Sequence, residues 1–266
     1  MSKRNMRKAW IALSCAILMM VAVPSQGANL LQNGSKLVFT GDATVSATAL
    51  NWVCDRPGDS ACTPTPPANA GDFAVTSSTL TFSPYNGTFG LIMNLNEGAE
   101  PIGATTLLSN FITFDMNNNI TLDLTEIPTG TKTLSATCAG ISDCTPTNPI
   151  YFNATTNPGS ASAFNLDYDS NSNTTTASFS FFGIVHDNVD STTASFVGSF
   201  SEPLTGVTPQ QVVTELNTPP GTITQGYGEN GTLTITTTPE PATTMLFGSG
   251  LLAIAFVLRL RGRRSS

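Results

Sequence analysis

Charged residues are scarce in this sequence, and basic ones are almost confined to its two ends. Charged side chains make up 11% of the 266 residues, and only Lys36, Arg56 and Lys132 carry positive charge between the terminal basic clusters. With 18 acidic residues against them, the body has no basic face to attract phosphates, which argues against nucleic acid as a partner. The negative charge instead suits an exposed protein that must stay soluble.

Histidine is nearly absent, and the familiar catalytic motifs are missing. His186 is the one histidine, and the chain has no Gly-x-Ser-x-Gly elbow, no phosphate-binding glycine loop and no dinucleotide fingerprint. A lone histidine at a strand end is usually a turn residue, although a triad that uses His186 stays open. Pairs of acids, which here are Asp123 with Glu126 and Glu97 with Glu100, are common on surfaces. We therefore predict no catalytic residues and no enzymatic role for the body.

Cysteines are few and unevenly spaced. Cys15 lies in the first apolar segment, and the other positions are Cys54, Cys62, Cys138 and Cys144. An even set in an oxidising compartment predicts two disulfides. The spacing favours pairing the first two with each other and the last two with each other, although four cysteines permit three connectivities. Zinc binding is disfavoured because neither pair has the two-residue spacer of a zinc knuckle.

The N-terminal segment has the three parts of a secretory signal peptide. A basic start is followed by an apolar run from Ala9 to Val23, and the small residues Gly27 and Ala28 offer a cleavage site. The apolar run is short for a membrane span, and Pro24 ends it. Residues 1–28 are therefore predicted to direct export and to be removed by signal peptidase.

The C-terminal segment also has three distinct parts. A triplet of Pro239, Glu240 and Pro241 comes first, and its prolines keep the backbone extended and accessible. The apolar stretch Met245–Leu258 follows, and it is shorter than the roughly 20 residues of a comfortable transmembrane helix. The last part is a basic cluster of Arg259, Arg261, Arg263 and Arg264. Positive charge beside an apolar helix predicts a cytoplasmic end, with the body on the outside.

Taken together, these three parts resemble the PEP-CTERM sorting signal, which is sometimes catalogued as an ice-binding protein C-terminal domain. The resemblance covers residues 238–266 and implies that an exosortase, a membrane-embedded cysteine transpeptidase, recognises the Pro-Glu-Pro triplet. It further implies that the tail is cut and that the protein passes to the cell surface or the exopolysaccharide matrix. An ordinary C-terminal membrane anchor is the alternative.

The body, residues 29–237, is predicted to be an all-β domain, an antiparallel β-sandwich with one short helix. Apolar and polar residues alternate with the period of a half-buried strand in several segments. The helix is expected over Thr208–Leu216, where Thr208 can cap, Pro209 suits the first turn and Gln211 completes a capping box; we expect it to cover one end of the domain. The strands are expected at 36–40, 44–52, 78–82, 88–95, 111–114, 120–125, 163–168, 177–181, 195–200 and 232–236.

One segment has the opening spacing of a calcium loop. Its oxygen-bearing side chains at alternate positions are Asp167, Asp169, Asn171 and Asn173. Ser172 stands where such a loop has a turn glycine, and Ser178 stands where it has a bidentate glutamate. A polar hairpin tip is the favoured interpretation, no metal ligands are predicted, and calcium is the one cofactor left open. Short threonine arrays such as Thr232–Thr236 invite an ice-binding interpretation, but threonine is also a common strand residue.

The leading hypothesis is an exported protein of the surface or extracellular matrix with a structural or adhesive role. Exosortase and signal peptidase are its expected processing enzymes, exopolysaccharide is a candidate partner, and the membrane is a transient contact. The alternative is a secreted hydrolase of matrix polysaccharide, which would need a cleft with two close carboxylates or His186 beside an acid.

Overall fold

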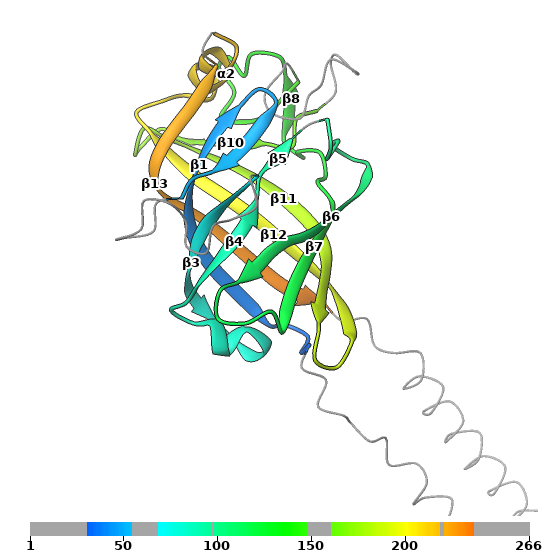
Figure 1. Ribbon diagram of the computed structural model, residues 1–266. Coiled ribbons are helices and arrows are strands. Elements are labelled where there is room, and N and C mark those ends of the chain that lie inside the picture. The colour runs from blue at the N-terminus through cyan, green and yellow to red at the C-terminus, as the bar shows by residue number, and fades with distance from the viewer. Residues whose placement is uncertain (1–30, 55–68, 97, 148–160, 219–220, 237–266) are drawn as a thin grey trace, which may run out of the picture. The chain divides into compact units, whose positions relative to one another are not determined.

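The computed structural model describes residues 31–54, 69–96, 98–147, 161–218 and 221–236 (Figure 1). Strands dominate this part of the chain, which confirms the all-β class. The predicted signal peptide and the C-terminal sorting segment with its apolar helix lie outside the described residues. Within the described ranges, no helix is long and apolar enough to cross a membrane.

Two helical segments accompany the strands: a 3-10 helix, η1 (Leu80–Tyr85), and an α-helix, α2 (Pro209–Leu216). The strands are β1 (Lys36–Ser46), β2 (Ala49–Trp52), β3 (Ala70–Ser78), β4 (Phe89–Met93), β5 (Leu95–Asn96), β6 (Thr105–Phe114), β7 (Ile120–Glu126), β8 (Thr133–Ser135), β9 (Asp143–Pro146), β10 (Asn165–Asp169), β11 (Thr174–Asp187), β12 (Thr192–Thr205) and β13 (Thr222–Thr236).

The described strands form one sheet that closes on itself. Its order is β12-β13-β1-β3-β4-β6-β7-β11, and β11 pairs back with β12, so the result is an eight-stranded antiparallel barrel. β11 and β12 pair along their whole length, from Thr174 with Thr205 to Asp187 with Thr192. The predicted antiparallel β body is thus present. The two layers expected for a sandwich are opposite walls of one closed sheet. β10, β9 and β8 extend this sheet beyond β11.

Several segments differ from the sequence-based expectation, among them β8 and β9, which were not predicted, and β6, which begins six residues before the expected 111. The strand predicted at 78–82 is wrong, because β3 ends at Ser78 and η1 begins at Leu80. Pro84 has no N–H for a strand ladder, and the helical turn instead buries Phe82 and Tyr85. β3 itself was not predicted, since its Gly-Asp start is atypical of strands. By contrast, α2 and its capping box agree with the prediction.

The barrel interior is packed by phenylalanines that lie over glycines of the neighbouring strand. Phe181 pairs with Gly198, and a Cβ added to Gly198 would lie 2.2 Å from the Phe181 ring. The neighbouring pair is reversed, since Phe196 covers Gly183. The same arrangement joins Phe39 to Gly231 and Phe73 to Gly90. Each glycine leaves the space that an aromatic ring fills, so ring and glycine fix the register of adjacent strands.

Phe200 is the centre of the aromatic core. Its ring centroid lies 4.7 Å from Phe181, 5.1 Å from Phe179 and 5.5 Å from Phe39. Trp52 adds a fourth ring at 4.7 Å. Offset and edge-to-face aromatic pairs each add roughly 0.5–1.5 kcal/mol beyond the area they bury. Strands β1, β2, β11 and β12 are therefore joined through one side chain.

We predict that Gly198→Ala destabilises the protein by about 3 kcal/mol, because its methyl group would overlap the Phe181 ring inside a filled barrel. Gly98→Ala is the matched control, since the nearest atom to an added Cβ there is the side-chain oxygen of Asn96 at 3.3 Å, and a surface change of this kind alters stability by about 0.5 kcal/mol or less. Denaturant unfolding followed by circular dichroism measures both values. Equal stability of the two variants would contradict the packing described here.

Candidate functional site at the helix-covered end of the barrel

The two ends of the barrel differ in what they carry. At one end Lys36, at the start of β1, pairs with Thr234 near the end of β13, so the described chain enters and leaves together. At the other end Ser46 pairs with Thr222. Helix α2 lies across this second end (Figure 1), where the hollow described below is found. The start of β1 and the end of β13 thus lie together at the entry end, and the candidate site lies at the opposite end.

Helix α2 is fixed over the barrel by its first turn. The Thr208 backbone N–H donates to Gln211 Oε1 at 2.7 Å, and the Gln211 N–H donates to Thr208 Oγ1 at 3.4 Å. The Thr175 hydroxyl of β11 donates to the Val207 carbonyl at 2.6 Å, which ties the loop before the helix to the barrel. The buried face of α2 includes Val212 and Leu216, so the helix presents apolar side chains to the strands below.

A small apolar cavity of about 40 Å³ lies between α2 and the barrel. This volume exceeds the roughly 10–15 Å³ that a single water molecule needs. Its walls come from β1, β2, β10, β11, β12, β13 and α2. Apart from Ser201 and Glu202, every lining side chain is apolar: Ala43, Val45, Leu50, Phe164, Leu166, Ala177, Phe179, Phe200, Leu204, Val212, Leu216 and Ile223.

Glu202 is the ionisable side chain of this cavity. It follows Phe200 by two positions on β12 and precedes Leu204 by two, so all three share the inner face of the barrel. The Glu202 Oε2 atom is buried and has no hydrogen-bond partner. Burial, and secondarily the negative charge of Asp42 on β1, raises the pKa of Glu202 to about 7. Such a carboxyl is neutral in mildly acidic solution and charged above neutrality.

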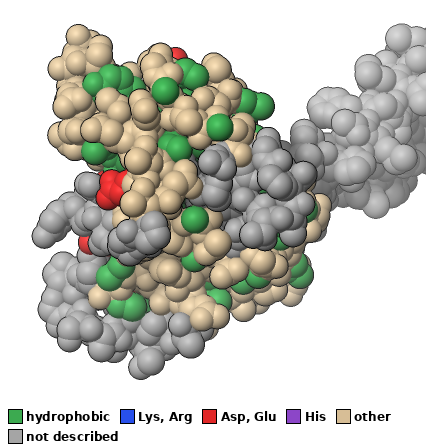
Figure 2. Space-filling model, turned by 90° about the horizontal axis from the view of Figure 1, so that it is seen from above, with side chains coloured by type: hydrophobic (Ala, Val, Ile, Leu, Met, Phe, Trp, Pro, Cys, Tyr) green, Lys and Arg blue, Asp and Glu red, His purple; other side chains and the backbone are tan. Residues whose placement is uncertain are grey.

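Figure 2 looks onto this end of the barrel. Among the described residues in that view, acidic side chains are visible between uncharged ones, and no lysine or arginine is visible. The cavity that Glu202 lines lies at this same end, between α2 and the barrel. The sequence analysis missed Glu202 because the expected strand stopped at residue 200. Continuing the apolar alternation through Leu204 would have placed the carboxyl inside.

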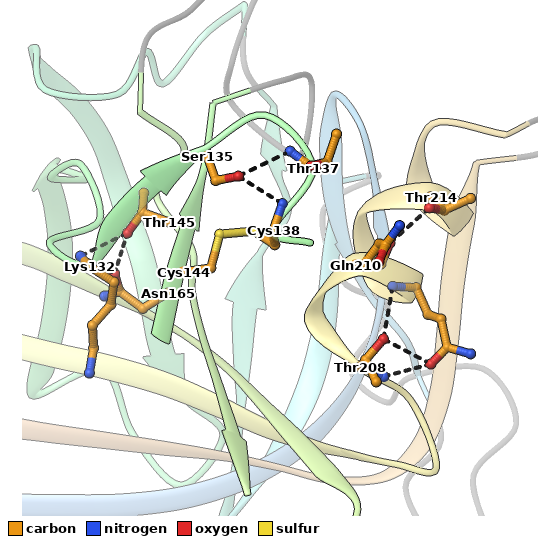
Figure 3. The surroundings of a disulfide bond; sticks show 11 residues. Lys132, Ser135, Thr137, Cys138, Cys144, Thr145, Asn165, Thr208, Gln210 and Thr214 are labelled. Carbon is orange, nitrogen blue, oxygen red and sulfur yellow. Dashed lines mark hydrogen bonds between the residues drawn. A yellow bond between two sulfur atoms is a disulfide. The ribbon is translucent and has the colours of Figure 1, made fainter. Parts of the chain in front are cut away.

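A disulfide stabilises the sheet extension beside the cavity (Figure 3). Cys138 and Cys144 are bonded, as predicted, and their Cα atoms lie 5.8 Å apart. The Ser135 hydroxyl accepts the Cys138 N–H at 3.0 Å, which fixes the loop that the disulfide closes. Cys144 pairs with Leu166 of β10, and Leu166 lines the cavity. Cys54 is also disulfide-bonded, and its predicted partner, Cys62, lies outside the described residues.

Asn165 connects the same extension to the loop before β8. Its Oδ1 atom accepts a hydrogen bond from the Thr131 N–H at 2.8 Å. It accepts another from the Thr145 hydroxyl at 2.8 Å (Figure 3). Lys132 Nζ lies 2.7 Å from Asp167 Oδ1, and this contact raises the pKa of the Lys132 ammonium. Loop, β9 and β10 thereby form one connected wall next to the cavity.

The segment with the calcium-loop spacing forms the tip of the β10–β11 hairpin, which is the interpretation that the sequence analysis favoured. Asp169 Oδ1 accepts the Asn171 N–H at 2.9 Å, and Asp169 Oδ2 accepts the Ser172 hydroxyl at 3.0 Å. Asn173 Oδ1 accepts the Tyr168 hydroxyl at 2.9 Å. Asp167 contacts Lys132, as described above. These side chains are therefore engaged within the hairpin and its neighbour, and the described residues contain no cluster of three or more typical metal ligands.

His186 pairs with an acid on the outer face of the barrel. Its Nε2 atom lies 2.9 Å from Asp123 Oδ2, and Asp123 Oδ1 accepts the Asn110 N–H at 2.7 Å. His186 stands opposite Thr121 on β7, so Asp123 is its diagonal neighbour. The sequence analysis did not connect these two residues, because their contact depends on strand register. The pair joins β6, β7 and β11, and none of the hydrogen bonds of the described residues joins it to a serine or cysteine nucleophile.

We predict that Cys138→Ser with Cys144→Ser lowers the stability by about 2 kcal/mol, as expected for a disulfide that closes a short loop. Thermal unfolding by circular dichroism, with and without reductant, provides the measurement. Reductant should lower the melting temperature of the double variant further, because the Cys54 disulfide remains. A double variant as stable as the wild type would show that the loop does not depend on this bond.

We predict that Glu202 makes the protein less stable as the pH rises. Its pKa is 4.5 in the unfolded reference and about 7 in the fold, so the folded state holds the proton more tightly and stability falls between these values. Relative to Glu202→Gln, the wild-type melting temperature should fall by roughly 3 °C from about pH 5 to about pH 8, after allowance for partial exposure. Glu215→Gln, an exposed change on α2, should keep the wild-type pH response; a Glu202→Gln variant that also keeps it would contradict the burial argument.

The comparisons with known proteins concern the far C-terminal segment. Residues 237–264 match the family model of the PEP-CTERM protein-sorting motif, which includes the predicted triplet Pro239, Glu240 and Pro241 and the arginine cluster Arg259, Arg261, Arg263 and Arg264. Curated proteins and solved structures gave no significant match. The matched motif identifies no catalytic family. The chain carries a PEP-CTERM protein-sorting motif and is therefore an exported protein that an exosortase sorts to the cell surface or the extracellular space.

Proposed function

We propose that the barrel is a structural or adhesive module of the cell surface or extracellular matrix, attached through its entry end. This proposal rests on one observation: the sorting motif follows the last barrel strand in the chain without a linker. The last residue of β13, Thr236, pairs with Ser195 of β12, and the sorting motif begins at the next residue. The helix-covered end lies at the other extreme of β13, beside Thr222. Attachment at one end would leave the other available to partners.

The sorting segment has a separate role for each of its three parts. Pro239, Glu240 and Pro241 form the recognition sequence for the exosortase, because two prolines keep this peptide extended. The apolar stretch holds the protein in the membrane only until processing, and the arginine cluster keeps the last residues on the cytoplasmic side. Signal peptidase removes residues 1–28 at export, and exopolysaccharide is the proposed contact of the delivered barrel.

A structural role also agrees with the build of the barrel. Its interior is filled by aromatic rings around Phe200, and the sheet closes so that the barrel strands are paired on both sides. Closure removes the unpaired edges through which exposed sheets aggregate. The hydrolase alternative finds one of the parts it needs, because His186 lies beside Asp123. This pair is on the outer face of the barrel, however, and none of the hydrogen bonds of the described residues joins it to a serine or cysteine. We therefore favour display over hydrolysis.

We predict that a triple variant of Pro239→Ala, Glu240→Ala and Pro241→Ala is exported but not processed. Intact-mass spectrometry of membrane, surface and medium fractions from an exosortase-containing host provides the readout. The wild type should end near the triplet and leave the membrane, whereas the variant should keep its tail through Ser266 and stay membrane-bound.

Pro219→Ala with Pro220→Ala is the control, because this second proline pair lies outside the matched residues; it should be processed like the wild type. A wild-type protein that keeps its tail through Ser266 in every fraction would overturn the sorting role and leave an ordinary anchor. Matrix binding is then tested on the delivered protein, by co-sedimentation with exopolysaccharide from the same host, and failure to co-sediment would remove the adhesive part of the proposal.

A further inference from the structure

We propose that the cavity under α2 is a binding site for a small alkylammonium compound, with the alkyl group in the cavity and the ammonium against Glu202. This inference is independent of how the protein is sorted. It depends on three observations: an apolar cavity at the helix-covered end of the barrel, a buried carboxylate oxygen without a hydrogen-bond partner, and the negative charge of Asp42 nearby.

The cavity has the composition of a small-molecule site. Such sites are mostly apolar with a few polar groups that fix the ligand, and the mouths of β-barrels are common places for them. Here Phe179 and Phe200 come from the barrel interior, while Val212 and Leu216 come from α2. The cavity of about 40 Å³ is small, so it suits a short alkyl group and not a long acyl chain or a sugar ring.

The polar group at this cavity selects for a cation. Glu202 Oε2 is buried without a hydrogen-bond partner, and a buried acceptor of this kind is costly to leave unpaired. Asp42 does not line the cavity, but its negative charge acts on Glu202 from β1, and no lining residue other than Glu202 is charged. Glu215 lies on the exposed side of α2, and no basic side chain of the described residues lines the cavity.

An ammonium group would offset two unfavourable contributions, the unpaired Glu202 oxygen and the repulsion between the two carboxylates. Its N–H groups would donate to the unpaired oxygen, and its charge would offset the repulsion between Glu202 and Asp42. A neutral alcohol of the same length could donate one hydrogen bond but would leave the repulsion in place. A carboxylate of the same length would add a third negative charge. The expected order of affinity is therefore alkylammonium, then alcohol, then carboxylate.

We predict that butylamine binds this site more tightly than butanol and that butyrate does not bind. The probe is a titration of the exported protein, purified from whichever cell fraction holds it, followed by methyl NMR of Val212, Leu204 and Leu216. Butylamine stays protonated across the range used, whereas Glu202 ionises on passing about pH 7. The affinity for butylamine should therefore rise roughly tenfold from about pH 5 to about pH 8, and the affinity for butanol should stay constant.

Two variants decide whether Glu202 is responsible. Glu202→Gln keeps the shape but removes the charge, so the preference for butylamine and its pH dependence should both disappear. Glu215→Gln removes one negative charge from the exposed side of the same helix and should bind like the wild type. Equal affinity of butylamine and butanol for the wild type at about pH 8, or an unchanged preference in Glu202→Gln, would overturn the proposal. Methyl shifts spread evenly outside the cavity would mark nonspecific association and would overturn it as well.

Discussion

The cross-strand pairing of phenylalanine with glycine is the constraint on which the barrel depends. An eight-stranded barrel has an interior just wide enough for its own side chains, so rings cannot fill every opposed inward position, although Phe179 and Phe200 do face each other. Phe181 with Gly198 and Phe39 with Gly231 meet this limit by giving one strand the ring and the other the space. A shift of one residue would turn the rings of one strand out of the barrel, and a shift of two would place Phe181 opposite Phe196 or Phe200. Packing therefore sets register, and register sets closure.

Closure in turn decides which polar residues come together. His186 and Asp123 are 63 positions apart in the chain and meet only because β7 and β11 pair in one register. The same logic places Glu202 in the cavity, since closure through β11 and β12 gives β12 an inner face along its whole length. The inner position beyond Phe200 lies where the ring packing gives way to the cavity. A carboxyl is tolerated there because the end of the barrel is only partly sealed by α2.

Local signals in the sequence were sufficient for some features and not for others. The α2 capping box, the Cys138–Cys144 pair and the hairpin after Asp169 each depend on residues close in the chain, and the structure contains all three. The 3-10 turn at Leu80 and the closing of the sheet depend on distant packing, which alternation alone does not encode. Glu202 was missed for a related reason, because a single acid ended the apparent strand.

The two ends of the barrel differ in how much their parts contribute to its stability. The entry end is secured by the backbone pairing of β1 with β13 and leads directly into the sorting motif. The opposite end is built from parts that a closed sheet does not require: α2, the disulfide-bonded extension and a carboxyl whose charge costs stability above neutrality. A protein that needed only a rigid barrel would be more stable with an apolar residue in place of Glu202. The position of Glu202 beside an apolar cavity is better explained by a ligand that brings a positive charge to its carboxylate.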